Sequence, residues 1–205
     1  MPRRLPTRGR PSWNQFLVEV KRCRLCRGYS KVKAVPAAKA WTGCDPPDPS
    51  ELPRGKGGRR VLFLSEAPPG GSETFFWRDQ RDRLRVFLFD ALRDAGFSIG
   101  QGDDGLTDFG SLGFYLLPSF SYPCGIRRYG TIRNTKPSRE MIQHSARVHL
   151  SMAIRVIDPT EVVLLGESAV TAGMALGLKS YPTYWPTNRT GHWDDVVAAI
   201  KKALL

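Results

Sequence analysis

Short, continuously apolar runs alternate with stretches of helical periodicity over the last two thirds of the chain. Three runs have the length of a buried strand, at residues 61–64, 113–117 and 162–165, and a fourth strand is expected over residues 181–185. A strand of a parallel sheet is covered on both faces, so its sequence is continuously apolar rather than alternating. These runs therefore predict a parallel or mostly parallel sheet of about four strands.

Helical spacing of apolar residues predicts a helix before, between and after these strands. The main predicted helices cover residues 81–95, 138–157, 167–176 and 192–204. Ser12 is placed to cap a further short helix, and Gly96 and Pro159 stand where two of the helices should end. Strands that alternate with helices favour the α/β class, and we predict a three-layer α/β/α sandwich.

The chain length suits a single domain, since 205 residues are enough for one α/β core with an ordered extension. Residues 1–11 are basic and proline-rich, which predicts a disordered tail. Residues 12–205 then form one α/β domain. Within it, we expect residues 12–59 to make an N-terminal helix and a cysteine-containing irregular extension, and residues 60–205 to make the sheet core.

Positive charge is concentrated in the first part of the chain. Residues 1–60 contain 15 Lys and Arg against 4 Asp and Glu, a balance of +11 out of the net +12. Such a segment is either a solvated tail or an arm that neutralises phosphates. A second basic segment favours the phosphate interpretation, because it is interleaved with tyrosines and is free of acidic residues. Its cations are Arg127, Arg128, Arg133, Lys136 and Arg139. Cations beside aromatic rings suit backbone contact and base stacking, so DNA is the predicted partner.

The apolar runs are all too short to cross a bilayer, and the basic N-terminal segment has no secretory signal pattern. We therefore expect a cytoplasmic, monomeric protein that does not engage a membrane.

A turn built from two prolines and two glycines follows the first predicted strand. It reads Ser-Glu-Ala-Pro-Pro-Gly-Gly over residues 65–71 and puts Glu66 at the carboxyl end of the strand. Ligands bind at that end of an open α/β sheet, and a carboxylate there can position or deprotonate a water. A plain strand-to-loop turn with an exposed glutamate has the same spacing.

Three adjacent aromatic residues, Phe75, Phe76 and Trp77, come soon after this turn. They can pack inward, or one of them can form the surface on which an extruded base stacks.

Several segments, in the same order along the chain, resemble the family 4 and family 5 uracil-DNA glycosylases. The turn at residues 65–70 resembles their motif A, and the other matching segments are residues 23–26, 114–117, 127–139 and 162–169, with residues 181–187 in the place of their motif B. The resemblance spans residues 23–203. It implies a four-stranded parallel sheet between helices and hydrolysis of the N-glycosidic bond of a flipped nucleotide. It also implies that Glu66, with Ser65 and Ala67, forms the catalytic turn, and that Phe75 or Phe76 stacks on the base.

The chain departs from this family where the base should be read. Pro118 or Ser119 stands in the place of the base-reading asparagine, and Trp185 stands in the place of the motif B histidine. A proline cannot supply the amide that distinguishes uracil from cytosine. Excision of another damaged, deaminated or modified base is therefore expected, with DNA binding without excision as the alternative. We predict that the base is contacted by Ala67, Ser119, Trp185 and Asn188, together with the aromatic residues above, and that Arg189 contacts the DNA. Asn188, Arg189 or His192 is the candidate substitute for the missing histidine.

A third interpretation is a nucleotide-binding α/β protein unrelated to this family. The chain contains neither a Walker-type phosphate loop nor a Gly-x-Gly-x-x-Gly segment, which disfavours that interpretation.

Four cysteines form the candidate metal ligands: Cys23, Cys26, Cys44 and Cys124. A Cys-x-x-Cys pair in a cytoplasmic chain favours a metal over disulfides. The resemblance implies a [4Fe-4S] cluster, tetrahedral zinc fits the ligand count, and unligated thiols are the remaining possibility. The family's fourth ligand would fall near Ser145, where this chain has no cysteine. His144 and His149, on the same predicted helix, are expected to be surface or packing residues.

Overall fold

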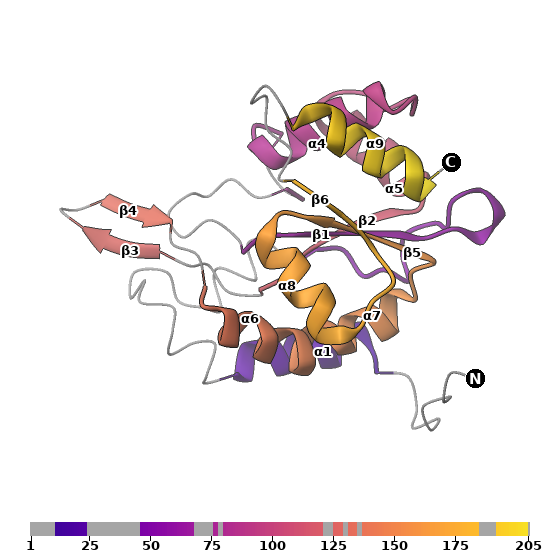
Figure 1. The fold of residues 1–205 in the computed structure, drawn as a ribbon. Helices are drawn as coiled ribbons and strands as arrows, with labels where there is room; N and C mark the ends of the chain where they lie inside the picture. Colours follow the sequence, from indigo (N-terminus) through magenta and orange to yellow (C-terminus); the bar gives the residue numbers. More distant parts are fainter. Residues whose placement is uncertain are drawn as a thin grey trace.

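A computed structural model describes residues 11–23, 46–67, 76–77, 80–120, 125–128, 131–134, 137–184 and 192–204. Helices lie on both sides of a central sheet, as Figure 1 shows, so the predicted three-layer α/β/α arrangement is confirmed. None of the helices in these ranges has both the length and the apolar character needed to span a bilayer.

The central sheet is parallel and has the strand order β2-β1-β5-β6. Its strands are β1 (Val61–Ser65), β2 (Phe114–Pro118), β5 (Glu161–Leu165) and β6 (Tyr181–Thr183). All four were predicted. Leu62 and Leu64 of β1 join one core cluster, whereas Val61 and Phe63 join the other. Successive side chains of a strand point to opposite faces, so a strand with both faces covered must be apolar at every position.

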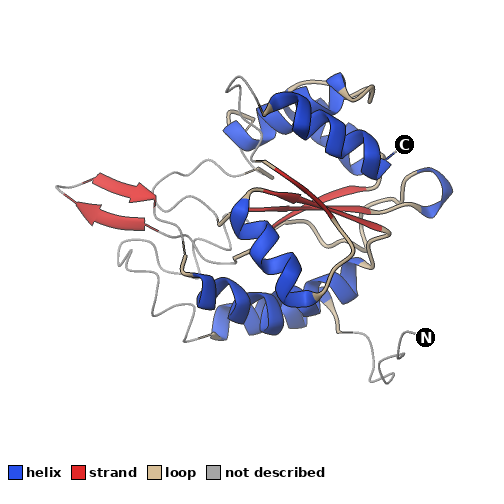
Figure 2. Cartoon of the chain, in the orientation of Figure 1, coloured by secondary structure: helices blue, strands red, loops and turns tan. Residues whose placement is uncertain are grey.

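Two groups of helices cover the sheet (Figure 2). One face carries α1 (Trp13–Arg22), α6 (Arg139–Ser145), the π-helical segment η2 (Ala146–Leu150), α7 (Ser151–Ile157) and α8 (Glu167–Leu176). The other face carries α4 (Arg83–Asp94), α5 (Gly102–Ser111) and α9 (Trp193–Leu204). The chain leaves β1 toward β2 along one face and leaves β5 toward β6 along the other. The gap between β1 and β5 is therefore the point at which the strand order reverses.

The predicted helix starts are set by side-chain caps. Ser12 accepts a hydrogen bond from the Gln15 backbone N–H at 3.1 Å, and the Gln15 side chain accepts one from the Ser12 N–H at 2.8 Å. This reciprocal pair is a capping box. The helix predicted from Ser138 to the residue before Pro159 is continuous through α6, η2 and α7, with one π turn in its middle.

Three features of the fold differ from the sequence prediction. Helix α5 was not predicted, because it contains three glycines and only two large apolar side chains and so shows little periodicity. Residues 125–128 and 131–134 form an antiparallel hairpin, β3 (Gly125–Arg128) and β4 (Thr131–Asn134), within the second basic segment, for which no strand was predicted. In α4, helical spacing puts Phe87 on the predicted apolar face with Leu84 and Leu88, but Phe87 is only half-buried, whereas Phe89 and Arg85 are buried.

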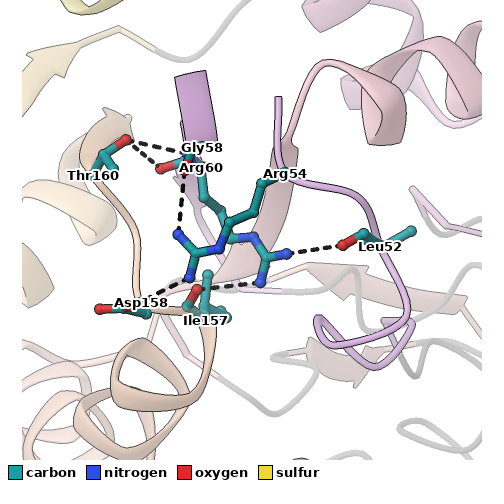
Figure 3. Close-up of polar contacts among 7 residues, drawn as sticks. All are labelled: Leu52, Arg54, Gly58, Arg60, Ile157, Asp158 and Thr160. Carbon is teal, nitrogen blue, oxygen red and sulfur yellow. Dashed lines mark hydrogen bonds and ion pairs between the residues drawn. The ribbon is translucent and has the colours of Figure 1, made fainter. Parts of the chain in front are cut away.

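The irregular extension is fastened to the amino end of the sheet by arginines (Figure 3). Arg60 donates to the carbonyl oxygens of Leu52 at 2.9 Å and Ile157 at 3.3 Å, and burial lowers its pKa. Arg54 pairs with Asp158 at 3.2 Å. Arg59 donates to the carbonyl oxygen of Leu204. These three cations belong to the basic segment that was expected to neutralise phosphates, and they make internal contacts instead.

Candidate active site at the carboxyl edge of the sheet

The carboxyl ends of the four strands meet along one edge, which we call the carboxyl rim. Ser65 at the end of β1 is level with Pro118 of β2, and Leu165 of β5 is level with Thr183 of β6. Backbone hydrogen bonds continue past the strands, from the Ser119 N–H to the Ser65 carbonyl at 2.8 Å and from the Gly166 N–H to the Thr183 carbonyl at 3.0 Å. Each outer strand is thus hydrogen-bonded to its inner neighbour beyond the strand end, whereas the pairing of β1 with β5 ends at Leu64 and Leu164.

Glu66 lies at the strand-order reversal between β1 and β5. A Cβ placed on Gly166 would lie 3.2 Å from Glu66 Oε1 and 3.3 Å from Glu66 Cγ, so the glutamate side chain rests against the turn that leads into α8. The side chain is half-buried. Open α/β sheets bind their ligands in the crevice at this reversal, and the positive end of a helix dipole favours a carboxylate. The structure therefore holds Glu66 at the expected ligand position.

Gly166 is the residue that makes this placement possible. Its φ is 90° and its ψ is 174°, a conformation that is essentially restricted to glycine. A side chain here would both strain the backbone and displace the Glu66 carboxylate.

We expect Gly166→Ala to lower the free energy of unfolding by about 1–3 kcal/mol, because alanine is strained in this conformation. Chemical denaturation measures the loss. A suitable control is Gly177→Ala at the other end of α8, where φ is 61° and no atom lies within 4 Å of an added Cβ. The control should lose less stability and should not disturb Glu66. Equal losses in both variants, with unchanged chemistry at Glu66, would contradict this role for Gly166.

Ser65, predicted at the catalytic turn, is buried, with 4% of its surface exposed. Its hydroxyl lies within hydrogen-bond distance of the carbonyl oxygens of Glu66, at 3.3 Å, and Leu117, at 3.4 Å. These contacts tie the turn to β2, so the hydroxyl holds the backbone that carries Glu66. Ala67, the next residue of the predicted turn, is half-buried against the core on the α8 side.

Two hydroxyl groups of the rim are buried without a hydrogen-bond partner among the described residues. They are Ser119 Oγ, predicted as a base contact, and Thr183 Oγ1, which sequence reasoning missed. Buried polar groups are nearly always satisfied, so a ligand or a water is the expected partner. Each hydroxyl can both donate and accept. The signal for Thr183 in the sequence was its position as the last residue of a strand.

Phe76, predicted as a possible base-stacking residue, belongs to the core instead. It is 5% exposed and packs edge-to-face on Phe89 at 5.8 Å and on Phe109 at 5.3 Å. The alternative stated for these aromatics, inward packing, therefore applies to Phe76. Phe75 lies outside the described residues.

An aromatic pair stands directly after β6, near the place of motif B. Tyr184 and His192 stack with ring centroids 3.9 Å apart and an interplanar angle of 24°, and Tyr184 is 51% exposed. His192 was predicted as a possible substitute for the missing histidine. Trp185, Asn188 and Arg189 lie outside the described residues.

Three of the predicted DNA-binding arginines are on the β3–β4 hairpin, which stands away from the sheet and its helices in Figure 1. The register places Arg127 and Arg128 on one strand and Arg133 on the other. Arg139 is exposed at the first turn of α6. Lys136 lies outside the described residues. The hairpin thus brings three cations that a loop would have left apart onto one ribbon.

Three of the four predicted metal ligands, Cys26, Cys44 and Cys124, lie outside the described residues. Cys23 ends α1, and its Sγ lies 4.0 Å from Nε2 of His144 on α6. Among the described residues, no three metal-binding side chains come together. His149 is a buried packing residue, as expected, and burial and the nearby His144 lower its pKa to about 4. The contact of His144 with Cys23 was not predicted.

No family model matches the chain, and no curated protein matches it. Function is therefore inferred from the chemistry of the carboxyl rim.

Proposed function

We propose that the protein is a DNA glycosylase that hydrolyses the N-glycosidic bond of a damaged, deaminated or modified base. The observation that carries the proposal is the Glu66 carboxylate, held at the strand-order reversal against Gly166. The base would be flipped out of the strand and bound at the carboxyl rim, because its glycosidic bond is out of reach inside the stack.

The reaction needs little more than a well-placed carboxylate. A water attacks C1′ of the deoxyribose, the C1′–N bond breaks, and its electron pair leaves with the base. The sugar becomes cationic in the transition state, which a nearby negative charge stabilises. Glu66 would orient the water and accept its proton, while the leaving base is protonated in turn.

The two unpartnered hydroxyls of the rim support a target other than uracil alone. An asparagine amide presents a fixed donor and a fixed acceptor, whereas Ser119 Oγ and Thr183 Oγ1 can each rotate to donate or to accept. The two hydroxyls lie at the opposite outer strands, β2 and β6, so one of them would contact a given base edge, without demanding one pattern. We therefore propose that the base is read less strictly than by an amide, with deaminated purines and bulkier modified pyrimidines as the target classes.

DNA is the proposed polyanion because the chain carries a net charge of +12. Arg54, Arg59 and Arg60 make internal contacts, so the proposed phosphate contacts fall to the arginines of the hairpin sequence and to the exposed Arg139. Neutralised phosphates release counterions, so binding should weaken steeply as salt rises.

A panel of oligonucleotides, each with one lesion, tests the proposal. Free base is measured after incubation with the full chain, on single-stranded and on double-stranded substrates, and DNA binding is measured in parallel. Release of free base from at least one lesion supports glycosylase activity. Binding without release would establish the alternative, a DNA-binding relative that does not excise, and would overturn the proposed reaction.

A further inference from the structure

An exposed aromatic side chain stands at the outer edge of the carboxyl rim. Tyr184 is 51% exposed, and it is the one aromatic among the large apolar side chains that are exposed in the described part of the chain. Its ring stacks on the imidazole of His192, with ring centroids 3.9 Å apart and planes at 24°. The stack closes one ring face to solvent, so the exposed surface of the ring lies on its edges and its opposite face. A single exposed apolar side chain needs no explanation by itself, so the place of this pair and the elements that hold it decide what it can do.

Two regular elements hold the stacked rings. Tyr184 directly follows β6, and α9 begins one residue after His192. The His192 carbonyl accepts a hydrogen bond from the N–H of the buried Val196 at 3.2 Å, which joins His192 to the first turn of α9. Strand β6 and helix α9 pack against each other. The pair is therefore ordered before a ligand arrives, and this lowers the entropic cost of binding.

The strand that carries Tyr184 is bonded to the turn that supports Glu66. The carbonyl of Thr183, the residue before Tyr184, accepts a hydrogen bond from the Gly166 N–H at 3.0 Å. Gly166 in turn lies against Glu66, because a Cβ added to it would be 3.2 Å from Glu66 Oε1. One backbone hydrogen bond therefore separates the end of β6 from the turn beside the proposed catalytic carboxylate.

We propose that the Tyr184–His192 pair is a stacking surface for a DNA base with a free face, such as the neighbour of the flipped nucleotide. This inference rests on the proposed function, since it needs DNA at the carboxyl rim, but it does not need the excision reaction. Every nucleobase has a flat π face that stacks on an aromatic ring, so the surface would accept any base. A base inside an intact duplex is covered on both faces, whereas flipping uncovers the base beside the gap. Bases of single strands and of opened strands are therefore the expected ligands.

The charges around the pair favour a base over a phosphate. Asp194 and Asp195 are exposed in the first turn of α9, and Asp195 Oδ2 lies 3.8 Å from His192 Nδ1. Two carboxylates repel a phosphate, whereas a neutral base carries no such cost. Arg139, a proposed phosphate contact, lies on α6, which covers the other face of the sheet from α9. Stacking on Tyr184 should therefore add affinity without adding to the salt dependence of binding.

Binding of single-stranded oligothymidylate to the full chain, measured over a range of salt concentrations, tests this surface. Tyr184→Leu keeps an apolar side chain but removes the aromatic ring. We expect it to bind roughly 5–150-fold more weakly, the usual effect of losing one base stack, with an unchanged slope of log affinity against log salt. Tyr184→Phe is the matched control, because it keeps the ring, and it should bind like the wild type. Wild-type affinity in Tyr184→Leu, or an equal loss in Tyr184→Phe, would overturn the proposal.

A strand of the same length whose sugars carry no bases separates stacking from phosphate contact, and it needs no variant. The wild type should bind this strand more weakly than oligothymidylate, and Tyr184→Leu should reduce the difference. Equal affinity of the wild type for both strands, or an equal loss by Tyr184→Leu on both, would overturn the stacking surface. The excision reaction is judged separately. Loss of the preference in Tyr184→Leu without any release of free base would keep the surface and contradict the reaction, whereas base release with unchanged binding by Tyr184→Leu would do the reverse.

Discussion

Replacing Glu66 with glutamine should lower the single-turnover rate of base release by about 10²–10⁴-fold, the usual contribution of a positioned acid or base. Glutamine keeps the size of the side chain and its position against Gly166. A Cβ added to Gly166 would lie 3.2 Å from Glu66 Oε1. It removes the negative charge that would stabilise the cationic sugar and the group that would accept the proton of the water. The affinity for lesion DNA should stay within about two-fold, because the phosphate contacts are unchanged.

The matched control is Glu161→Gln, at the first residue of β5 and therefore at the opposite edge of the sheet. This variant loses the same charge but should retain the wild-type rate. A Glu66→Gln variant that released base as fast as the wild type would remove Glu66 from the proposed reaction. Equal slowing in both variants would point to net charge rather than to position.

The second large effect is expected in the core rather than at the rim. Phe109→Ala should lower the free energy of unfolding by about 3–5 kcal/mol, the usual cost of deleting a buried phenyl ring. Phe109 is fully buried on α5, and its ring lies within 6.0 Å, centroid to centroid, of five other aromatic rings. Those rings belong to Phe63, Phe76, Trp77, Phe89 and Phe114. Urea denaturation measures the change.

Val86→Ala serves as its control, because Val86 is 42% exposed on α4 and should change stability by less than about 0.5 kcal/mol. A loss below about 1 kcal/mol in Phe109→Ala would mean that the cluster can collapse into the space. It would contradict the assignment of Phe76 to a tightly packed core and reopen its assignment as a base-stacking surface.

The sheet and most helices could be predicted because their signals are local. A strand with both faces covered must be apolar throughout, and Ser12 and Ser138 cap helices through bonds to residues three positions away. Helix α5 escaped prediction because Phe109 is its one large side chain that is fully buried, and Phe109 meets rings from distant segments. The β3–β4 hairpin escaped because its strands contain arginine rather than alternating apolar residues.

Some features of the candidate site could likewise be predicted from the sequence, and others could not. Glu66 could be placed from the sequence, since it follows a strand and the carboxyl ends of parallel strands share one edge. Its contact with Gly166, the unpartnered hydroxyl of Thr183 and the meeting of Cys23 with His144 depend on long-range packing that no local spacing encodes. The charge balance of residues 1–60 also could not show that Arg54 and Arg60 make contacts within the protein.

The most direct test of the proposed chemistry is mass spectrometry of both products after incubation of lesion oligonucleotides in ¹⁸O-labelled water. Attack of a water oriented by Glu66 predicts free, unlabelled base and an abasic strand with one ¹⁸O at C1′, formed by the wild type and almost absent with Glu66→Gln. Lesion strands that stay bound and intact across the whole panel, with no free base and no label at C1′, would contradict it.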